Sequence, residues 1–301
     1  MLNYYFLKIN FIMENDSLLN EPDKKKILRL IGSKNFDKII GMLEKISSDH
    51  AGTAKTKDKR FVIREIVREI IEKEGNRESE FYKTGMYFCK RKEDNAKEIG
   101  VSLIWRGYDH APEKVKEMLH RISDDPNWEV REYAGNAFAE TLYYHKDFLT
   151  DLKKWSKHPS ENVRRAVVFS ALGVRDEKKY KTGFKILRSL MNDSSVYVKK
   201  NLGPFILGSL YGSRFPEETA AFLKKESRSK DPYVRWNIIM SFNNSFGKRN
   251  PDKALEVMKV FTDDENIIVI RAMRSTLKFL KKHYPEKADK FIKENYELKF
   301  K

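Results

Sequence analysis

Cysteine, glycine and long apolar runs are all scarce in this sequence of 301 residues. The single cysteine, Cys89, excludes an internal disulfide framework and a cysteine-rich zinc site. The 14 glycines form neither a phosphate-binding loop nor a dinucleotide-binding motif. No apolar stretch reaches the roughly 18 residues that a membrane-spanning helix needs. These absences predict a cytoplasmic protein that has no membrane segment and uses no metal or other cofactor.

Positive charge is the main excess of the composition. Lysine and arginine number 60 against 44 aspartates and glutamates, which gives a formal net charge of +16. Hydrophobic residues make up 40% of the chain, enough for a continuous core. The charge favours a polyanionic partner, with nucleic acid first and an anionic membrane surface second. The alternative is a lysine-rich proteome in which this charge only solvates the surface.

One short pattern occurs five times: a polar turn, then a helix that opens with a valine and, in four copies, a basic residue. The anchor valines lie 33, 35, 36 and 35 residues apart, and they are Val130, Val163, Val198, Val234 and Val269. Repeats of this length are typical of helical solenoids, in which each unit buries its apolar face only against its neighbours. The predicted fold class is therefore all-α, a right-handed α–α superhelix of the HEAT/armadillo-like kind.

Each repeat is expected to pair a first helix with a second helix. The first helices are predicted at residues 112–122, 147–157, 177–191, 216–228 and 251–262, and the second helices at 128–143, 160–174, 195–211, 232–247 and 266–283. Positions four and eight residues after each anchor valine are apolar or small in every repeat. They share a helical face with the anchor, so they are predicted to form the core.

Three segments are predicted along the chain. Residues 1–13 form an N-terminal extension, because Met13 is an alternative start. Residues 14–111 form a helical cap, within which 48–59 reads as a linker and 60–74 as an amphipathic helix. Residues 112–301 form the repeat solenoid. A solenoid needs such an atypical end unit, since an open terminal face would expose its core.

A row of cations follows the anchor valines. Stacked repeats place equivalent positions side by side, so these cations form a ladder at the start of the second helices. Helix N-termini also favour anions, so the ladder is a candidate track for DNA phosphates. The alternative is structural pairing with Asp and Glu of the preceding turns. The residues are Arg131, Arg164, Arg165, Lys199, Lys200, Arg235 and Arg271.

Trp128 and Glu132 are the candidates for chemistry. Four residues apart on a helix, they share one face. An aromatic ring beside a carboxylate could hold a cationic base by cation–π attraction, or stabilise a positively charged sugar. The alternative is that Trp128 caps the repeat core and Glu132 pairs with Arg131 or Arg165.

The central part of the chain, about residues 112–282, resembles the HEAT-like-repeat DNA alkylation repair family, the AlkD-like alkylpurine DNA glycosylases. The stretches that carry the resemblance are Trp155 with Glu161–Val168, then Asn192–Gly203 and Arg214–Lys224. The resemblance implies an all-α solenoid with a basic concave surface for duplex DNA. It also implies metal-independent hydrolysis of the N-glycosidic bond of cationic N3- or N7-alkylpurines, without extrusion of the base.

Matched residue by residue, the family's active-site tryptophan corresponds to Trp128 and its catalytic aspartate to Glu132. A phosphate-contacting arginine corresponds to Arg165. Two positions depart from the family: the acid is one methylene longer, and the second cleft tryptophan is replaced by Pro204. The resemblance therefore supports the fold and DNA binding more directly than it supports catalysis.

We expect duplex DNA as the partner of a monomeric protein. A different class stays open: a non-catalytic HEAT-repeat scaffold that binds a protein or a structured nucleic acid. A protein-binding groove would be lined with exposed aromatic and aliphatic anchors, whereas DNA requires continuous positive potential.

Overall fold

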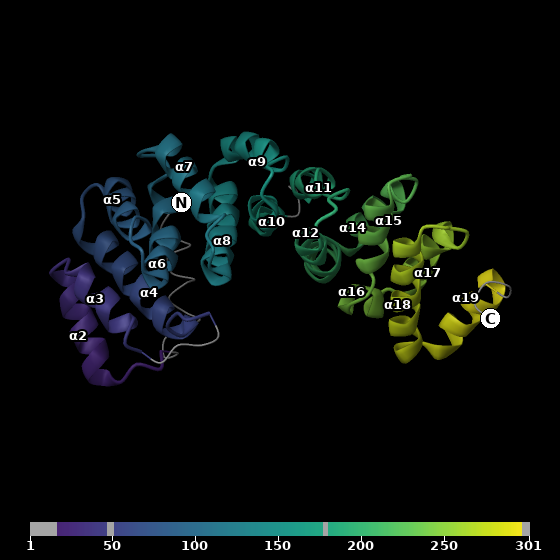
Figure 1. The fold of residues 1–301 in the computed structure, drawn as a ribbon, viewed down its shortest axis with the longest axis horizontal. Helices are drawn as coiled ribbons and strands as arrows, with labels where there is room; N and C mark the ends of the chain where they lie inside the picture. Colours follow the sequence, from purple (N-terminus) through teal and green to yellow (C-terminus); the bar gives the residue numbers. More distant parts are fainter. Residues whose placement is uncertain (1–16, 47–50, 177–179, 297–301) are drawn as a thin grey trace. The chain divides into compact units, whose positions relative to one another are not determined.

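The computed structural model describes residues 17–46, 51–176 and 180–296. These residues form helices and turns, with no strand among them (Figure 1). The predicted extension, residues 1–13, lies outside the described ranges. The chain divides into two compact units, unit 1 at Met1–Ala137 and unit 2 at Phe138–Lys301.

Unit 1 is a bundle of helices packed around one apolar core. The helices are α2 (Glu21–Gly32), α3 (Phe36–Leu43), α4 (Thr56–Lys73), α5 (Arg77–Cys89), α6 (Asp94–Ile104), η1 (Trp105–Gly107), α7 (Pro112–Ile122) and the start of α8 (Trp128–Tyr144). Helix α4 packs against α2, α5 and α6. The α5–α6 pair is so close that a Cβ on Gly85 would lie 2.6 Å from the Ile104 backbone, which requires glycine there.

The segment predicted as a linker is partly wrong. Helix α4 begins at Thr56 rather than Arg60, and Thr53, Asp58 and Lys59 are buried. Asp58 accepts hydrogen bonds from Ser17 Oγ and from the Leu18 backbone N–H. These small and charged residues show no apolar period because their burial depends on polar partners far away in the sequence.

Unit 2 contains the later repeats. Its first helices are α9 (Leu149–Trp155), α11 (Tyr180–Arg188), α14 (Pro216–Glu226) and α17 (Pro251–Met258). Its second helices are α10 (Glu161–Ser170), α12 (Val196–Lys200) continued by η5 (Asn201–Tyr211), α15 (Pro232–Met240) and α18 (Ile267–His283). The shorter elements are η2 (Lys146–Phe148), η3 (Ala171–Gly173), α13 (Gly212–Arg214), α16 (Ser245–Arg249) and η6 (Lys259–Phe261), and α19 (Pro285–Tyr296) ends the described chain.

The second helices of unit 2 stack in chain order, α10 on α12, η5 on α15 and α15 on α18 (Figure 1). The predicted core register is confirmed, because every anchor valine is at most 9% exposed. The positions four and eight residues further on are buried as well, and they are Ala134, Val167, Leu202, Ile238 and Met273, then Phe138, Ala171, Ile206, Phe242 and Leu277. The all-α superhelical fold class is thereby confirmed.

The repeated turn has a physical role as a two-step cap. In each repeat a polar side chain accepts a hydrogen bond from the backbone N–H two residues later, and that second residue in turn caps the second helix. Such caps satisfy amide groups that the helix itself leaves without partners. The pairs are Asp125 and Asn127, His158 and Ser160, Asp193 and Ser195, Ser229 and Asp231, and Asp264 and Asn266.

Two second helices differ from their predicted form. The helix expected at 232–247 ends at Met240, and Asn244 caps the short α16 by accepting from the Phe246 N–H. The helix expected at 195–211 is a π-helix from Asn201, with Pro204 inside it. Proline removes a backbone donor and crowds the preceding turn, and a wider helical turn accommodates it. Asn244 Nδ2 donates to the Pro204 carbonyl at 2.8 Å.

Candidate functional site

Trp128 and Glu132 lie in the first turns of α8, close to the last residues of unit 1. The Trp128 side chain is 42% exposed, and Glu132 is half-buried. The turn before them is tied to unit 1, because Asn127 Nδ2 donates to the Ala51 carbonyl at 3.1 Å and to Asp94 Oδ2 at 2.8 Å. The ring is thus presented at the surface from a turn that is held by hydrogen bonds.

Three of the predicted phosphate ligands share one structural contact. Arg131, Arg164 and Arg235 each donate from Nη1 to the backbone carbonyls five and six residues earlier. Each guanidinium therefore closes the turn that precedes its own helix. Because backbone carbonyls recur at the same place in every repeat, this contact by itself explains the repeated arginine.

Two of these arginines also bind a carboxylate. Arg164 meets Asp193 through Nε at 2.6 Å and Nη2 at 3.2 Å, and Arg235 Nε lies 2.7 Å from Asp264 Oδ2. Hydrogen bonding to Asp193 raises the pKa of Arg164. These are the structural pairs of the sequence-based alternative, although the carboxylates come from the following turn rather than the preceding one. A phosphate role for these arginines stays a prediction.

Arg165 and Lys199 are buried against aromatic rings. The Arg165 guanidinium carbon lies 4.5 Å from the ring centres of both Phe169 and Tyr197, and the side chain is 5% exposed. Lys199 Nζ lies 4.4 Å from the Tyr233 ring and 5.2 Å from that of Trp236. Burial lowers the pKa of Lys199.

Lys200 and Arg271 are the two predicted cations with exposed side chains. Both follow an anchor valine by two residues, one on α12 and the other on α18. Within the described ranges neither takes part in an ion pair. They are the members of the ladder whose charge is most accessible to a phosphate.

Four aromatic residues of unit 2 lie close to the predicted cations. They were not predicted from the sequence. Phe205 is 43% exposed and lies 6.1 Å from the Phe169 ring, while Tyr197, Tyr233 and Trp236 are half-buried beside the cations. A usable signal was present, because a tyrosine precedes the anchor valine in two consecutive repeats. Aromatic rings interleaved with cations are typical of surfaces that bind nucleic acid.

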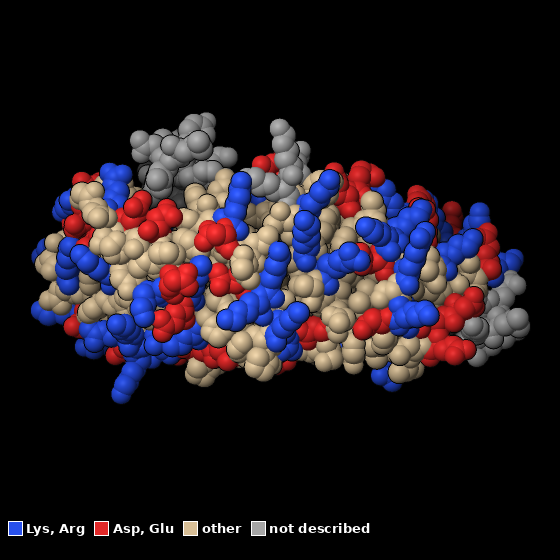
Figure 2. Space-filling view, turned by 90° about the horizontal axis from the view of Figure 1, so that it is seen from above, with Lys and Arg blue, Asp and Glu red and all other residues tan. Residues whose placement is uncertain are grey.

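The remaining features concern metal binding, the cysteine, membrane-spanning helices and the surface charge. Among the described residues, no group of three or more His, Cys, Asp or Glu is placed to hold a metal ion. Cys89 is buried, and burial raises the pKa of its thiol to about 12. No described helix has the length and apolar character needed to cross a bilayer. On the face drawn in Figure 2, Lys and Arg are interspersed with Asp and Glu.

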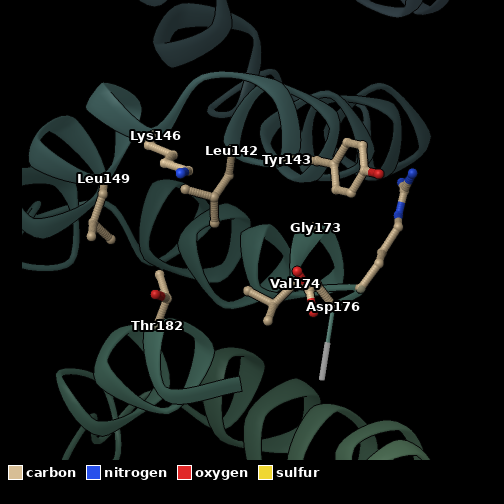
Figure 3. Close-up of a pocket in the computed structure, with 9 residues that line it drawn as sticks. Leu142, Tyr143, Lys146, Leu149, Gly173, Val174, Asp176 and Thr182 are labelled. Atoms are coloured by element: carbon tan, nitrogen blue, oxygen red, sulfur yellow. The ribbon is translucent and has the colours of Figure 1, made fainter. Parts of the chain in front are cut away.

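A pocket of about 280 Å³ lies in unit 2 (Figure 3). Arg175 at this pocket pairs with Glu140 and lies 4.9 Å from the Tyr143 ring centre. None of the predicted site residues lines it. The lining is Leu142, Tyr143, Lys146, Leu149, Gly173, Val174, Arg175, Asp176 and Thr182.

Stacked helix pairs with capped turns define a helical-repeat protein. A family model described as "DNA alkylation repair enzyme" matches residues 59–237, more than half of the chain. The protein belongs to the DNA alkylation repair enzyme family, and alkylation repair is its role. The matched segment contains Trp128 and Glu132.

One solved structure agrees in fold. AlkD2 from Streptococcus mutans superposes with a TM-score of 0.50 at 17% identity, over 70% of this chain and 97% of that one. YibA of Escherichia coli gives 0.40 at 15% identity, over 94% of both chains. At 17% identity the likeness to AlkD2 concerns the fold alone. No curated protein matches the sequence.

Proposed function

We propose that this protein binds duplex DNA and excises cationic N3- or N7-alkylpurines by hydrolysing the N-glycosidic bond. The observation that carries the proposal is the exposed Trp128 ring, one turn from Glu132 on α8, inside the segment matched by the repair family.

The chemistry needs few groups. Trp128 would contact the lesion nucleotide, whose positive charge is attracted to an aromatic face. The bond from sugar C1′ to the purine nitrogen breaks with both electrons going to the base, which leaves as a neutral molecule without needing a proton. The Glu132 carboxylate would stabilise the sugar cation, and water then adds at C1′ and releases a proton.

The direct test is incubation of the purified protein with methylated duplex DNA, followed by chromatography of the free bases. Release of alkylpurine above the rate of spontaneous loss is expected. Duplex binding without any release would instead favour the non-catalytic scaffold. The departures at Glu132 and Pro204 make that second result informative about which family residues catalysis requires.

Phosphate contact is assigned first to Lys200 and Arg271, because both are exposed and neither is in an ion pair within the described chain. Replacing either with alanine should flatten the slope of log K against log salt concentration by about 0.9, equally for all duplex sequences. Fluorescence anisotropy of a labelled duplex at several salt concentrations measures this slope.

The matched control for these variants is Lys224→Ala. Lys224 lies on the first helix α14 and pairs with Glu256 at 2.6 Å, so the slope should keep its wild-type value. Unchanged slopes in both Lys200→Ala and Arg271→Ala would show that DNA does not follow the start of the second helices.

A further inference from the structure

A buried ion cluster lies behind the first turn of α8. Lys59 of α4 is 0% exposed, and its ammonium group has three partners. Nζ donates to Thr53 Oγ1 at 2.8 Å and to Glu129 Oε1 at 2.9 Å, and it forms an ion pair with Glu98 of α6. The ammonium therefore makes two hydrogen bonds and one further ion pair within this cluster.

The cluster reaches Trp128 through one peptide bond. Glu129 follows Trp128 directly, and both of its carboxylate oxygens are engaged, Oε1 by Lys59 and Oε2 by Thr53 Oγ1 at 2.6 Å. Tyr133, one turn further along α8, places its ring 5.3 Å from Lys59 Nζ. The Glu129 side chain thus ties the backbone next to Trp128 to Lys59 and Thr53.

The charges in the cluster do not balance. One ammonium serves two carboxylates, and the Glu98 side chain is 0% exposed. Burial raises the pKa of Glu98 to about 7, opposed by Lys59 and assisted by the negative charges of Glu129 and Asp94. Burial also raises the pKa of Tyr133, further assisted by both glutamates and opposed by Arg60, so its hydroxyl stays protonated at neutral pH.

We propose that Glu98 is a positioning residue whose protonation state sets, through Lys59 and Glu129, how the first turn of α8 holds Trp128. With Glu98 protonated, the charge of Lys59 serves Glu129 alone, and the turn is held firmly. With Glu98 ionised, the two carboxylates share one ammonium, and the hold on Glu129 weakens. Its bearing on repair rests on the proposed function of Trp128, whereas the structural coupling does not.

The test uses the full chain without DNA, so it is independent of binding and excision. The tryptophan emission of Trp128→Phe, subtracted from that of the wild type, isolates the signal of Trp128. Between pH 5.5 and 8.5 this signal should change with a midpoint near 7. The change should be absent in Glu98→Gln, which keeps the shape of the side chain and removes its titration.

A second variant tests whether the coupling runs through Lys59 and Glu129. Glu129→Gln removes the competing carboxylate, so Lys59 stabilises ionised Glu98 more fully and any remaining transition should move to lower pH by about one unit. Glu65→Gln is the matched control, because Glu65 is a buried carboxylate of unit 1 that pairs with Arg64 and Arg68 instead. It should keep the wild-type midpoint. Circular dichroism confirms that each variant is folded.

The proposal is overturned if the Trp128 signal is flat in the wild type, or if the transition persists in Glu98→Gln. The second result would assign the titration to a group other than Glu98. If the transition behaves as expected but methylated DNA releases no alkylpurine, the coupling stands and only the assignment of a repair reaction to Trp128 fails.

Discussion

Glu132→Gln should lower the rate of alkylpurine release by a factor of about 10² to 10³, the usual loss when one electrostatic group is removed from a transition state. The base already carries positive charge and leaves without a proton. The carboxylate is therefore needed only while the sugar is cationic, and its loss lowers the rate rather than the affinity. Duplex affinity should stay equal or rise slightly, because a negative charge near phosphates is removed.

Single-turnover release of alkylpurine from methylated duplex measures this rate, and anisotropy measures the affinity of the same variant. Glu117→Gln is the control, since Glu117 is an exposed carboxylate on α7 and should leave both values unchanged. If excision continues undiminished in Glu132→Gln, another group stabilises the sugar. If the affinity falls with the rate, Glu132 supports the structure of α8.

The repeat architecture could be predicted because the residues that specify it lie close together in the sequence. The anchor valines and the apolar positions four and eight residues later repeat at every turn of the solenoid, and burial follows that register throughout. Capping residues likewise lie within two or three residues of the groups they satisfy. Helix α7, predicted at 112–122, occupies Pro112–Ile122, where a proline at its first position defines its start.

The arginines show where the residue type alone does not determine the contact that a side chain makes. A basic residue after the anchor valine can reach outward to a phosphate or back to the carbonyls of its own turn. Arg164 reaches back and also binds Asp193, 29 residues later. Lysine at the same position in the next repeat, Lys199, instead lies on two rings. Only the backbone geometry of the turn distinguishes these outcomes.

The Lys59 cluster could not be predicted at all. Its members come from three helices and a turn, with Glu98 39 residues and Glu129 70 residues beyond Lys59. Each residue alone reads as a surface charge, and the segment before Lys59 resembles a linker because it has no apolar period. The pairing becomes visible only after α4, α6 and α8 have packed together.

Lys59→Met should cost about 3–5 kcal/mol of unfolding free energy, the usual penalty when one partner of a buried ion pair is removed. Methionine fills a similar volume, so the loss comes from charge. Glu98 and Glu129 are left facing each other without the ammonium, and Thr53 loses a donor. Urea denaturation at pH 8 measures the change, with an unaltered m-value as evidence of the same unfolding transition.

The exposed counterpart is Lys34→Met. Lys34 pairs with Glu74 and Glu80 at the surface, where its side chain is 51% exposed, and the expected loss is below about 1 kcal/mol. A comparable loss in both variants would mean that Lys59 acts through packing rather than through its charge.

The pH dependence of the unfolding free energy distinguishes an effect of the Lys59 charge from an effect of its packing. A carboxyl whose pKa is raised by folding favours the folded state at low pH, and this contribution is lost as the pH rises through about 7. Removing Lys59 takes away the charge that opposes the shift, so Lys59→Met should lose more stability at pH 8 than at pH 5.5. Adding Glu98→Gln to Lys59→Met should recover much of the loss at pH 8, because one negative charge then remains in the cluster instead of two. A double variant no more stable than Lys59→Met at pH 8 would exclude carboxylate repulsion as the cause.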